Sequence, residues 1–136
     1  IPCRISSREE TEPTAFDETA AQTLSGCRIL LAEDNDLNAE ISIELLTREA
    51  FGERANDGVA CLEMLQKAPE DYYDLILMDI QMPIMDGYKA TRAIRRFSDK
   101  KKAGIPIVAM TANAFTEDKE RALESGMNDH VAKRLI

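Results

Sequence analysis

The sequence predicts an α/β protein in which helices cover both faces of a parallel β-sheet. Two observations support this fold class: short apolar runs alternate with longer segments of helical period, and the run at 75–78 is apolar without a break. Unbroken apolar runs are typical of parallel strands that are buried on both faces. In chain order, the expected strands are 28–32, 51–55, 75–78, 105–110 and 129–132.

The expected helices lie between these strands. Leu37, Ile41 and Leu45 recur at the spacing of one helical face, which predicts the first helix. The basic stretch 99–102 is expected to be a solvated loop. Glycine, proline and turn residues delimit the other segments. The expected helices are 37 to about 49, the segment between the turn at 56–58 and Pro69, 87 to about 96, and 116–125.

Five strands joined in this way fit the doubly wound, flavodoxin-like sheet order 2-1-3-4-5. In that order the first strand lies beside the third, and the third beside the fourth. The carboxyl ends of the central strands then share one edge of the sheet, which is where such folds bind ligands.

Length, composition and charge exclude several classes of protein. The chain has 136 residues, enough for one domain, and a formal net charge of −8. Such a charge disfavours unaided binding to nucleic acid or to anionic membranes. No apolar run approaches the roughly 18 residues that a membrane span needs. The three cysteines are widely spaced, which argues against a disulfide framework or zinc site and for a reducing, cytoplasmic location.

Residues 1–25 differ from the rest of the chain and are interpreted as a linker. Segment 6–23 is acidic, rich in Ser and Thr, and poor in large apolar residues. An alternative is a short helix that presents Phe16, Ala20 and Leu24 on one face. The predicted α/β domain therefore spans 26–136.

Polar side chains stand where the expected strands end. Glu33 and Asp34 follow the first strand, Asp79 the third, Thr111 the fourth and Lys133 the fifth. Each has an ordinary interpretation when taken alone, such as a helix cap, a turn residue or a surface lysine. The sheet order, however, brings all of them to one edge.

Three carboxylates gathered at one edge would repel each other. Two unit charges about 4 Å apart interact by roughly 4 kcal/mol at an effective dielectric near 20. A single lysine does not offset this repulsion, whereas Mg²⁺ with oxygen ligands does. The same cation would let a phosphoryl group approach Asp79, which then becomes a carboxylate nucleophile. Lys133 and the Thr111 hydroxyl would contact the phosphoryl oxygens.

Five motifs stand at the ends of the expected strands and in the loops that follow them: LAEDN at 31–35, LMDIQMP at 77–83, MDG at 85–87, MTA at 110–112 and AK at 132–133. With these motifs, segment 27–133 resembles the receiver domain of two-component response regulators. The resemblance implies that Asp79 accepts a phosphoryl group from a phosphohistidine. It also implies that Glu33 and Asp34 hold Mg²⁺ together with the backbone carbonyl of Gln81.

The resemblance also assigns roles in switching. Thr111 and His130 would report phosphorylation through a shift between two conformations. Gln81 and Asn113 would tune the lifetime of the phosphoryl group. The fragment would then be a phosphoacceptor with weak autophosphatase activity, rather than an enzyme acting on outside substrates.

Segments 34–38 and 82–87 are most similar to receivers fused to hybrid sensor histidine kinases. The resemblance implies that 1–5 ends a kinase ATP-binding domain and that 6–25 is the linker. It implies a parent sensor histidine kinase, for which a membrane anchor is one of the possibilities. The expected partners are a histidine kinase or its phosphohistidine domain, and a histidine phosphotransfer protein.

The chain departs from the family pattern in three places. Arg134 follows Lys133 where proline is usual, so a trans peptide is expected. His130 replaces the usual Tyr or Phe and is expected to be buried and neutral, with a pH-sensitive switch as the alternative. The sequence ends at Ile136, before the family's fifth helix. Either the N-terminal segment or a second copy, forming a homodimer, is expected to cover the face left bare.

Other functions are weighed against this one. A stand-alone response regulator would carry the same motifs. A Mg²⁺-dependent aspartyl-phosphate phosphatase would need a general acid two residues after Asp79, where this chain has Gln81. A flavodoxin would need a phosphate-binding loop where this chain has the acidic segment 33–36. An inactive receiver would have lost phosphorylation residues, and none is missing.

Overall fold

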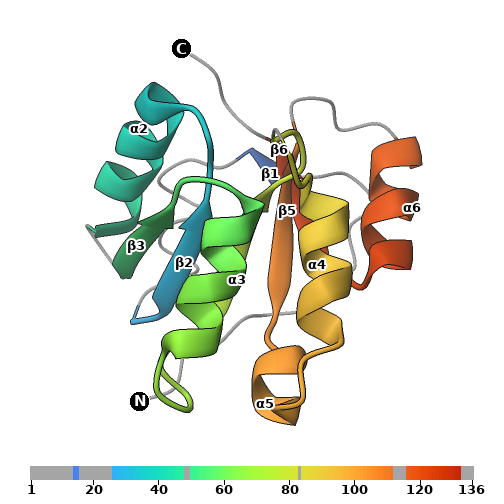
Figure 1. The fold of residues 1–136 in the computed structure, drawn as a ribbon. Helices are drawn as coiled ribbons and strands as arrows, with labels where there is room; N and C mark the ends of the chain where they lie inside the picture. Colours follow the sequence, from blue (N-terminus) through green and yellow to red (C-terminus); the bar gives the residue numbers. More distant parts are fainter. Residues whose placement is uncertain (1–13, 16–25, 48–49, 83, 112–115, 133–136) are drawn as a thin grey trace.

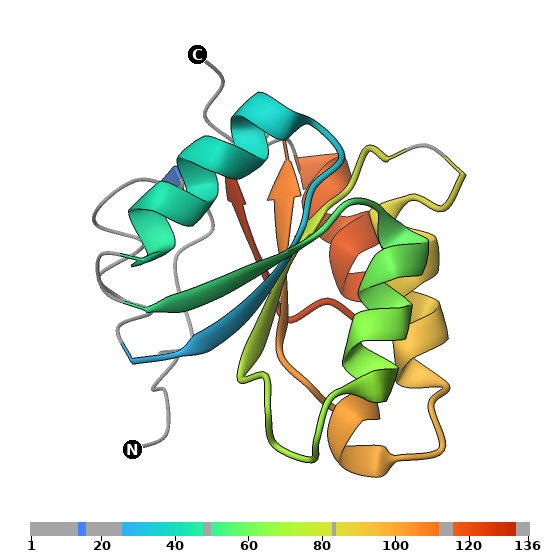
Figure 2. The ribbon, with the colours of Figure 1, turned by 60° about the vertical axis from the view of Figure 1, so that its left-hand side comes forward.

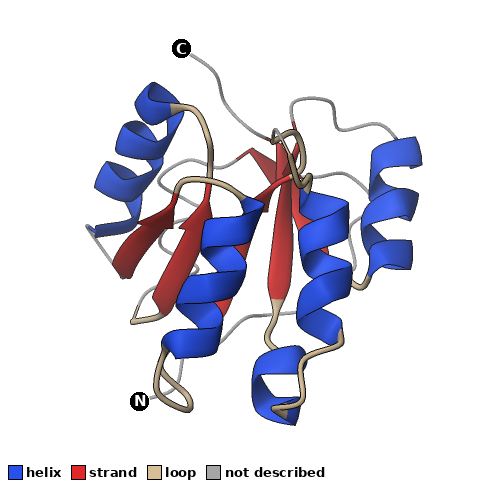
Figure 3. Ribbon diagram, viewed as in Figure 1, coloured by secondary structure: helices blue, strands red, loops and turns tan. Residues whose placement is uncertain are grey.

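The computed structural model describes residues 14–15, 26–47, 50–82, 84–111 and 116–132. The predicted α/β architecture is confirmed: a parallel sheet lies between helices (Figures 1 and 3). The elements are β1 (Thr14–Ala15), β2 (Arg28–Ala32), α2 (Asp36–Thr47), β3 (Phe51–Ala55), α3 (Gly58–Lys67), β4 (Leu75–Asp79), α4 (Gly87–Arg95), α5 (Lys100–Ala103), β5 (Ile107–Thr111), α6 (Thr116–Ser125) and β6 (Asp129–Ala132).

The sheet order is β1-β6-β5-β4-β2-β3, and every pair of neighbouring strands is parallel. Counted from β2 onward, the five predicted strands have the expected order 2-1-3-4-5. The two-residue strand β1 is an addition: it pairs with β6 and extends the sheet at that edge. The sequence predicts a linker here, because a segment of two residues has no periodicity that would indicate a strand.

The main differences from the predicted helices and strands lie at α5 and β5. Residues 100–103 form the short helix α5 rather than a loop, and the Asp99 carboxylate caps it by accepting from the amides of Lys101 and Lys102. Strand β5 begins at Ile107, two residues later than expected. Pro106, which has no amide to give to a ladder, stands just before it.

Helices lie on both faces of the sheet, as Figure 2 shows: α2 lies on one face, and α3, α4 and α6 lie on the other. Alternate residues of β2 supply the two cores, because successive side chains of a strand point to opposite faces. Leu30 packs in the core beneath α3 and α4, while Ile29 and Leu31 pack in the core beneath α2. All three are fully buried, which accounts for the apolar composition of β2.

Several predictions fall on residues outside the described part of the chain. These are the linker or helix around Phe16, Ala20 and Leu24, the peptide after Lys133, and the covering of the sheet face by an N-terminal segment or a second copy. Among the described helices, none has the length and apolar character needed to cross a membrane.

The cysteines depart from what their spacing suggests. Cys27, just before β2, is buried and disulfide-bonded, whereas Cys61 in α3 is a buried free thiol. A single disulfide bond is not a disulfide framework. Because Cys27 is disulfide-bonded, however, the spacing of the cysteines no longer supports a reducing compartment. Separation along the chain does not determine distance in the fold.

Candidate metal centre

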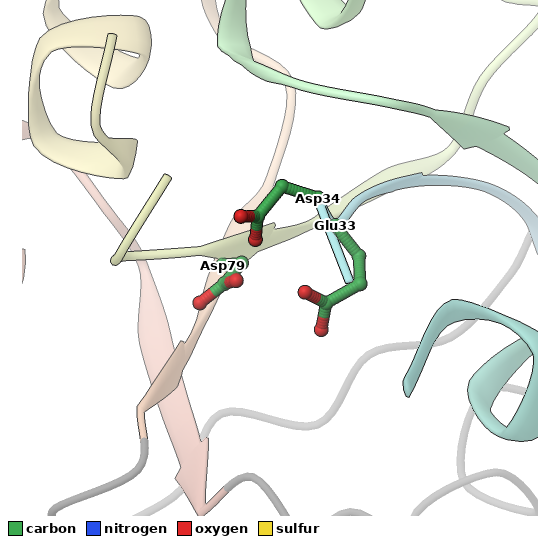
Figure 4. A group of neighbouring side chains, drawn as sticks. All are labelled: Glu33, Asp34 and Asp79. Atoms are coloured by element: carbon green, nitrogen blue, oxygen red, sulfur yellow. The ribbon is translucent and has the colours of Figure 1, made fainter. Parts of the chain in front are cut away.

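Three carboxylates meet at the carboxyl edge of the sheet. Glu33 and Asp34 directly follow β2, and Asp79 is the last residue of β4. One carboxylate oxygen from each lies within 4.8 Å of the others. Figure 4 shows the three groups turned toward a common space. The convergence predicted from the strand order is therefore present.

The register of the sheet explains this convergence. Strands β2 and β4 are neighbours, and Ala32 at the end of β2 pairs with Met78. The residue that follows each of these two, Glu33 and Asp79, is therefore at the same height along the sheet. Both side chains are buried, whereas Asp34 is exposed. The cluster thus has two sequestered acids and one that faces solvent.

The turn after β2 is held by hydrogen bonds at both ends. The Glu33 amide donates to the Ala55 carbonyl at 3.1 Å, and the Asn35 amide donates to the Glu33 carboxylate at 3.2 Å. The Asn35 side chain accepts from the Asn38 amide at 2.9 Å. Asn35 therefore caps the N-terminus of α2.

The loop after β4 packs closely against the backbone of Asp79. The Gln81 amide donates to the Asp79 carboxylate at 3.2 Å, and the Gly87 amide donates to the Ile80 carbonyl at 2.9 Å. A Cβ added to Gly87 would lie 2.5 Å from the Asp79 carbonyl oxygen. Only glycine therefore lets α4 begin so close to this acid.

The other predicted site residues are placed only in part. Thr111 ends β5, and its neighbour Met110 pairs with Asp79, so the Thr111 backbone lies at the same edge as the acids. The Thr111 side chain, Asn113 and Lys133 lie outside the described part of the structure. Gln81 is exposed beside Asp79.

His130 lies in β6, paired with Ala109 of β5, and only 6% of its surface is exposed. Burial was expected of a residue that replaces a packed aromatic ring. Its Nδ1 lies 3.7 Å from the Asp129 carboxylate. Its roles as a switch and as a neutral side chain remain predictions.

Arg54 was not singled out from the sequence. It lies in β3, and its guanidinium donates to the Glu33 carbonyl and to the Asp36 carboxylate. A basic residue in a short strand gives no signal of such a contact. The parallel register of β3 against β2, which pairs Leu31 with Arg54, creates it.

The donor set fits Mg²⁺. Carboxylate oxygens are the hard ligands that Mg²⁺ prefers, and it is usually held by a few carboxylates together with water or phosphate oxygens. Glu33, Asp34 and Asp79 supply three such groups within reach of one ion. A bound divalent cation would also offset the repulsion among them.

A family comparison agrees with this fold. Residues 29–135 match the model of the response regulator receiver domain. The chain therefore belongs to the response regulator receiver family.

Relatives place this family member within larger proteins. The chain is 44% identical over 111 residues to Hybrid signal transduction histidine kinase I of Dictyostelium discoideum, and 44% identical over 117 residues to Histidine protein kinase 1 of Candida albicans. These alignments cover 79% and 80% of this chain but only 6% and 5% of the relatives. The chain thus matches the receiver segments of hybrid histidine kinases in phosphorelay signalling and spans less than a tenth of those proteins.

Solved structures share the fold. The receiver domain of sensor histidine kinase PA1611 from Pseudomonas aeruginosa, described with a magnesium ion in its active-site cleft, is 38% identical with a TM-score of 0.67, covering 82% of this chain and 88% of that one. The chemotaxis protein CheY4 of Vibrio cholerae is 25% identical with a TM-score of 0.69, covering 82% and 90%.

Proposed function

We propose that this chain is the phosphoacceptor receiver of a hybrid sensor histidine kinase and that Asp79 carries the phosphoryl group. The observation that supports this proposal is the convergence of Glu33, Asp34 and Asp79 within 4.8 Å at the carboxyl edge of a receiver fold. A phosphoryl acceptor needs such an edge, because a carboxylate nucleophile must face an anionic donor without prohibitive repulsion.

In the proposed reaction, an Asp79 carboxylate oxygen attacks the phosphorus of a phosphohistidine. The O–P bond of an acyl phosphate forms, the N–P bond breaks, and the imidazole nitrogen takes a proton from solvent. Glu33, Asp34, Asp79 and the Gln81 carbonyl would hold Mg²⁺, which supplies positive charge to the transferring group when bound. Lys133 and Thr111 would bind the phosphoryl oxygens, and Gln81 and Asn113 would tune how long the acyl phosphate lasts.

The proposed setting follows from the relatives. The donor would be the phosphohistidine of the parent kinase, and the acceptor a histidine phosphotransfer protein. Water would slowly hydrolyse the acyl phosphate, so the fragment would show weak autophosphatase activity. Thr111 and His130 would carry the conformational response. A cytoplasmic location is proposed with this role, because phosphoryl donors of this kind are made from cytoplasmic ATP.

Intact-mass measurement after incubation with acetyl phosphate and Mg²⁺ tests the proposal. The wild-type protein should gain the mass of one phosphoryl group, and chelation of the metal should prevent the gain. Asp79→Asn should abolish it, whereas Asp74→Asn, the same substitution at the opposite end of β4, should not. Labelling that persists in Asp79→Asn would identify a different nucleophile and contradict the assignment.

A further inference from the structure

Arg54 connects the edge strand β3 to the turn that carries two of the three acids. Its Nε and Nη2 atoms both donate to the Glu33 carbonyl oxygen, at 3.0 and 2.9 Å. Its Nη1 donates to the Asp36 carboxylate at 2.9 Å. One side chain therefore contacts both ends of segment 33–36, and Asp34 lies between the two contacts.

The two halves of this contact differ in strength. The Arg54 side chain is 24% exposed, whereas that of Asp36 is 95% exposed, so solvent screens the ion pair. The bonds to the Glu33 carbonyl are more sheltered, and two donors on one acceptor orient the planar guanidinium. The carbonyl contact is therefore the part that restrains the turn.

We propose that Arg54 is a positioning residue for the metal centre, an inference that rests on the proposed function. By holding the Glu33 backbone, Arg54 keeps the carboxylates of Glu33 and Asp34 directed toward Asp79. Their mutual repulsion would otherwise be relieved by rotation of the turn away from β4. Substitution of partners that orient metal ligands typically weakens metal binding by about 10- to 100-fold.

The charge of Arg54 by itself would act in the opposite direction. A fixed cation near three carboxylates opposes the arrival of another cation, so removing it should tighten Mg²⁺ binding. Loss of positioning should instead weaken binding. The sign of the change in Mg²⁺ affinity therefore separates the two effects.

Calorimetric titration with Mg²⁺ measures this sign. Arg54→Ala should bind Mg²⁺ about tenfold more weakly than the wild type. Arg54→Lys keeps the charge but not the paired bonds, and it should also bind severalfold more weakly. Asp36→Asn, which removes only the exposed ion pair, should stay within about twofold of the wild type. Labelling of Arg54→Ala by acetyl phosphate should be slow at low Mg²⁺ and recover at saturating Mg²⁺.

Arg95→Ala is the matched control for a general loss of stability. Arg95 also donates to backbone carbonyls, but at the opposite end of the sheet. Its loss should lower the free energy of unfolding and leave the Mg²⁺ affinity unchanged. If Arg54→Ala does not fold, Arg54→Lys decides the question by itself. Binding by the Arg54 variants that equals or exceeds that of the wild type would overturn the inference. A wild-type protein that takes up no Mg²⁺ would instead overturn the proposed function.

Discussion

The two ends of the sheet use charge in opposite ways. At the amino end, Arg95 of α4 makes five hydrogen bonds, and Lys102 closes the end of α3. At the carboxyl end, three acids of like charge are brought within 4.8 Å of each other. Arg95 donates to the backbone carbonyls of Ala103, Ile105 and Gly126 and to the Asn128 side chain. Lys102 donates to the carbonyls of Gln66 and Ala68.

The charged side chains at the amino end stabilise the fold, whereas those at the carboxyl end form the candidate metal site. Charged donors at the amino end satisfy carbonyls that helices and strands leave without partners, which stabilises the fold. The acids at the carboxyl end repel one another, and a bound divalent cation would offset this repulsion. Their arrangement therefore fits the proposed metal site. Three predictions test this contrast.

The largest effect is expected where the carboxyl end is most tightly packed. Gly87→Ala places a Cβ 2.5 Å from the Asp79 carbonyl oxygen, so α4 must shift. The free energy of unfolding should fall by about 2–3 kcal/mol, and labelling by acetyl phosphate should slow because Asp79 moves. Gly104→Ala is the control, because its Cβ would meet Lys100 at 3.3 Å. Urea unfolding of both variants measures the difference, and equal stabilities would contradict the packing described here.

A smaller effect of opposite sign is expected from Asp79→Asn. Removing one of three neighbouring charges should stabilise the metal-free protein by about 1 kcal/mol. With Mg²⁺ at a hundredfold excess over its Kd, the wild type should gain about 2.7 kcal/mol and become the more stable of the two. Thermal unfolding with and without Mg²⁺ measures both changes.

Asp74→Asn is the matched control at the amino end. The Asp74 carboxylate accepts a hydrogen bond from the Arg28 amide at 2.8 Å, so this substitution should not stabilise the fold. If Asp74→Asn stabilises the protein as much as Asp79→Asn does, relief of the net charge rather than of the local cluster would be the cause.

The smallest effect near neutral pH concerns two tyrosines that precede β4. The pKa of Tyr73 is raised mainly by burial and secondly by a hydrogen bond to Glu53. The pKa of Tyr72 is raised mainly by its hydrogen bond to Glu53. Because the folded-state pKa is raised, the stability from Tyr73 is complete below the ordinary tyrosine pKa and is lost as pH rises above about 10. Burial raises the pKa of Cys61 to about 12, which acts in the same direction from about pH 9.

Denaturant unfolding between pH 8 and 11 and phenolate absorbance test this prediction. Stability should decline with pH, and Glu53→Gln should lower the pKa of both tyrosines. A Glu53→Gln protein with an unchanged absorbance titration would contradict the assignment.

Local patterns predicted much of this molecule. The bounds of β2, β3, α6 and β6 agree with those predicted from the sequence. The helix caps Asn35, Asp57 and Asp86 act within three residues of themselves. The position of each acid at the end of a strand is local information of the same kind, and the parallel sheet order then predicts that the acids share one edge.

Tertiary structure alone decided how those acids are held. Register between β2 and β3 places Arg54 against Glu33, and close packing of α4 makes Gly87 necessary beside Asp79. The pairing of β1 with β6 and the disulfide at Cys27 likewise depend on which distant segments meet. The physical reason is that the period and composition of a segment report its own conformation and burial. Hydrogen bonds between segments depend on register and approach, which only the packed chain determines.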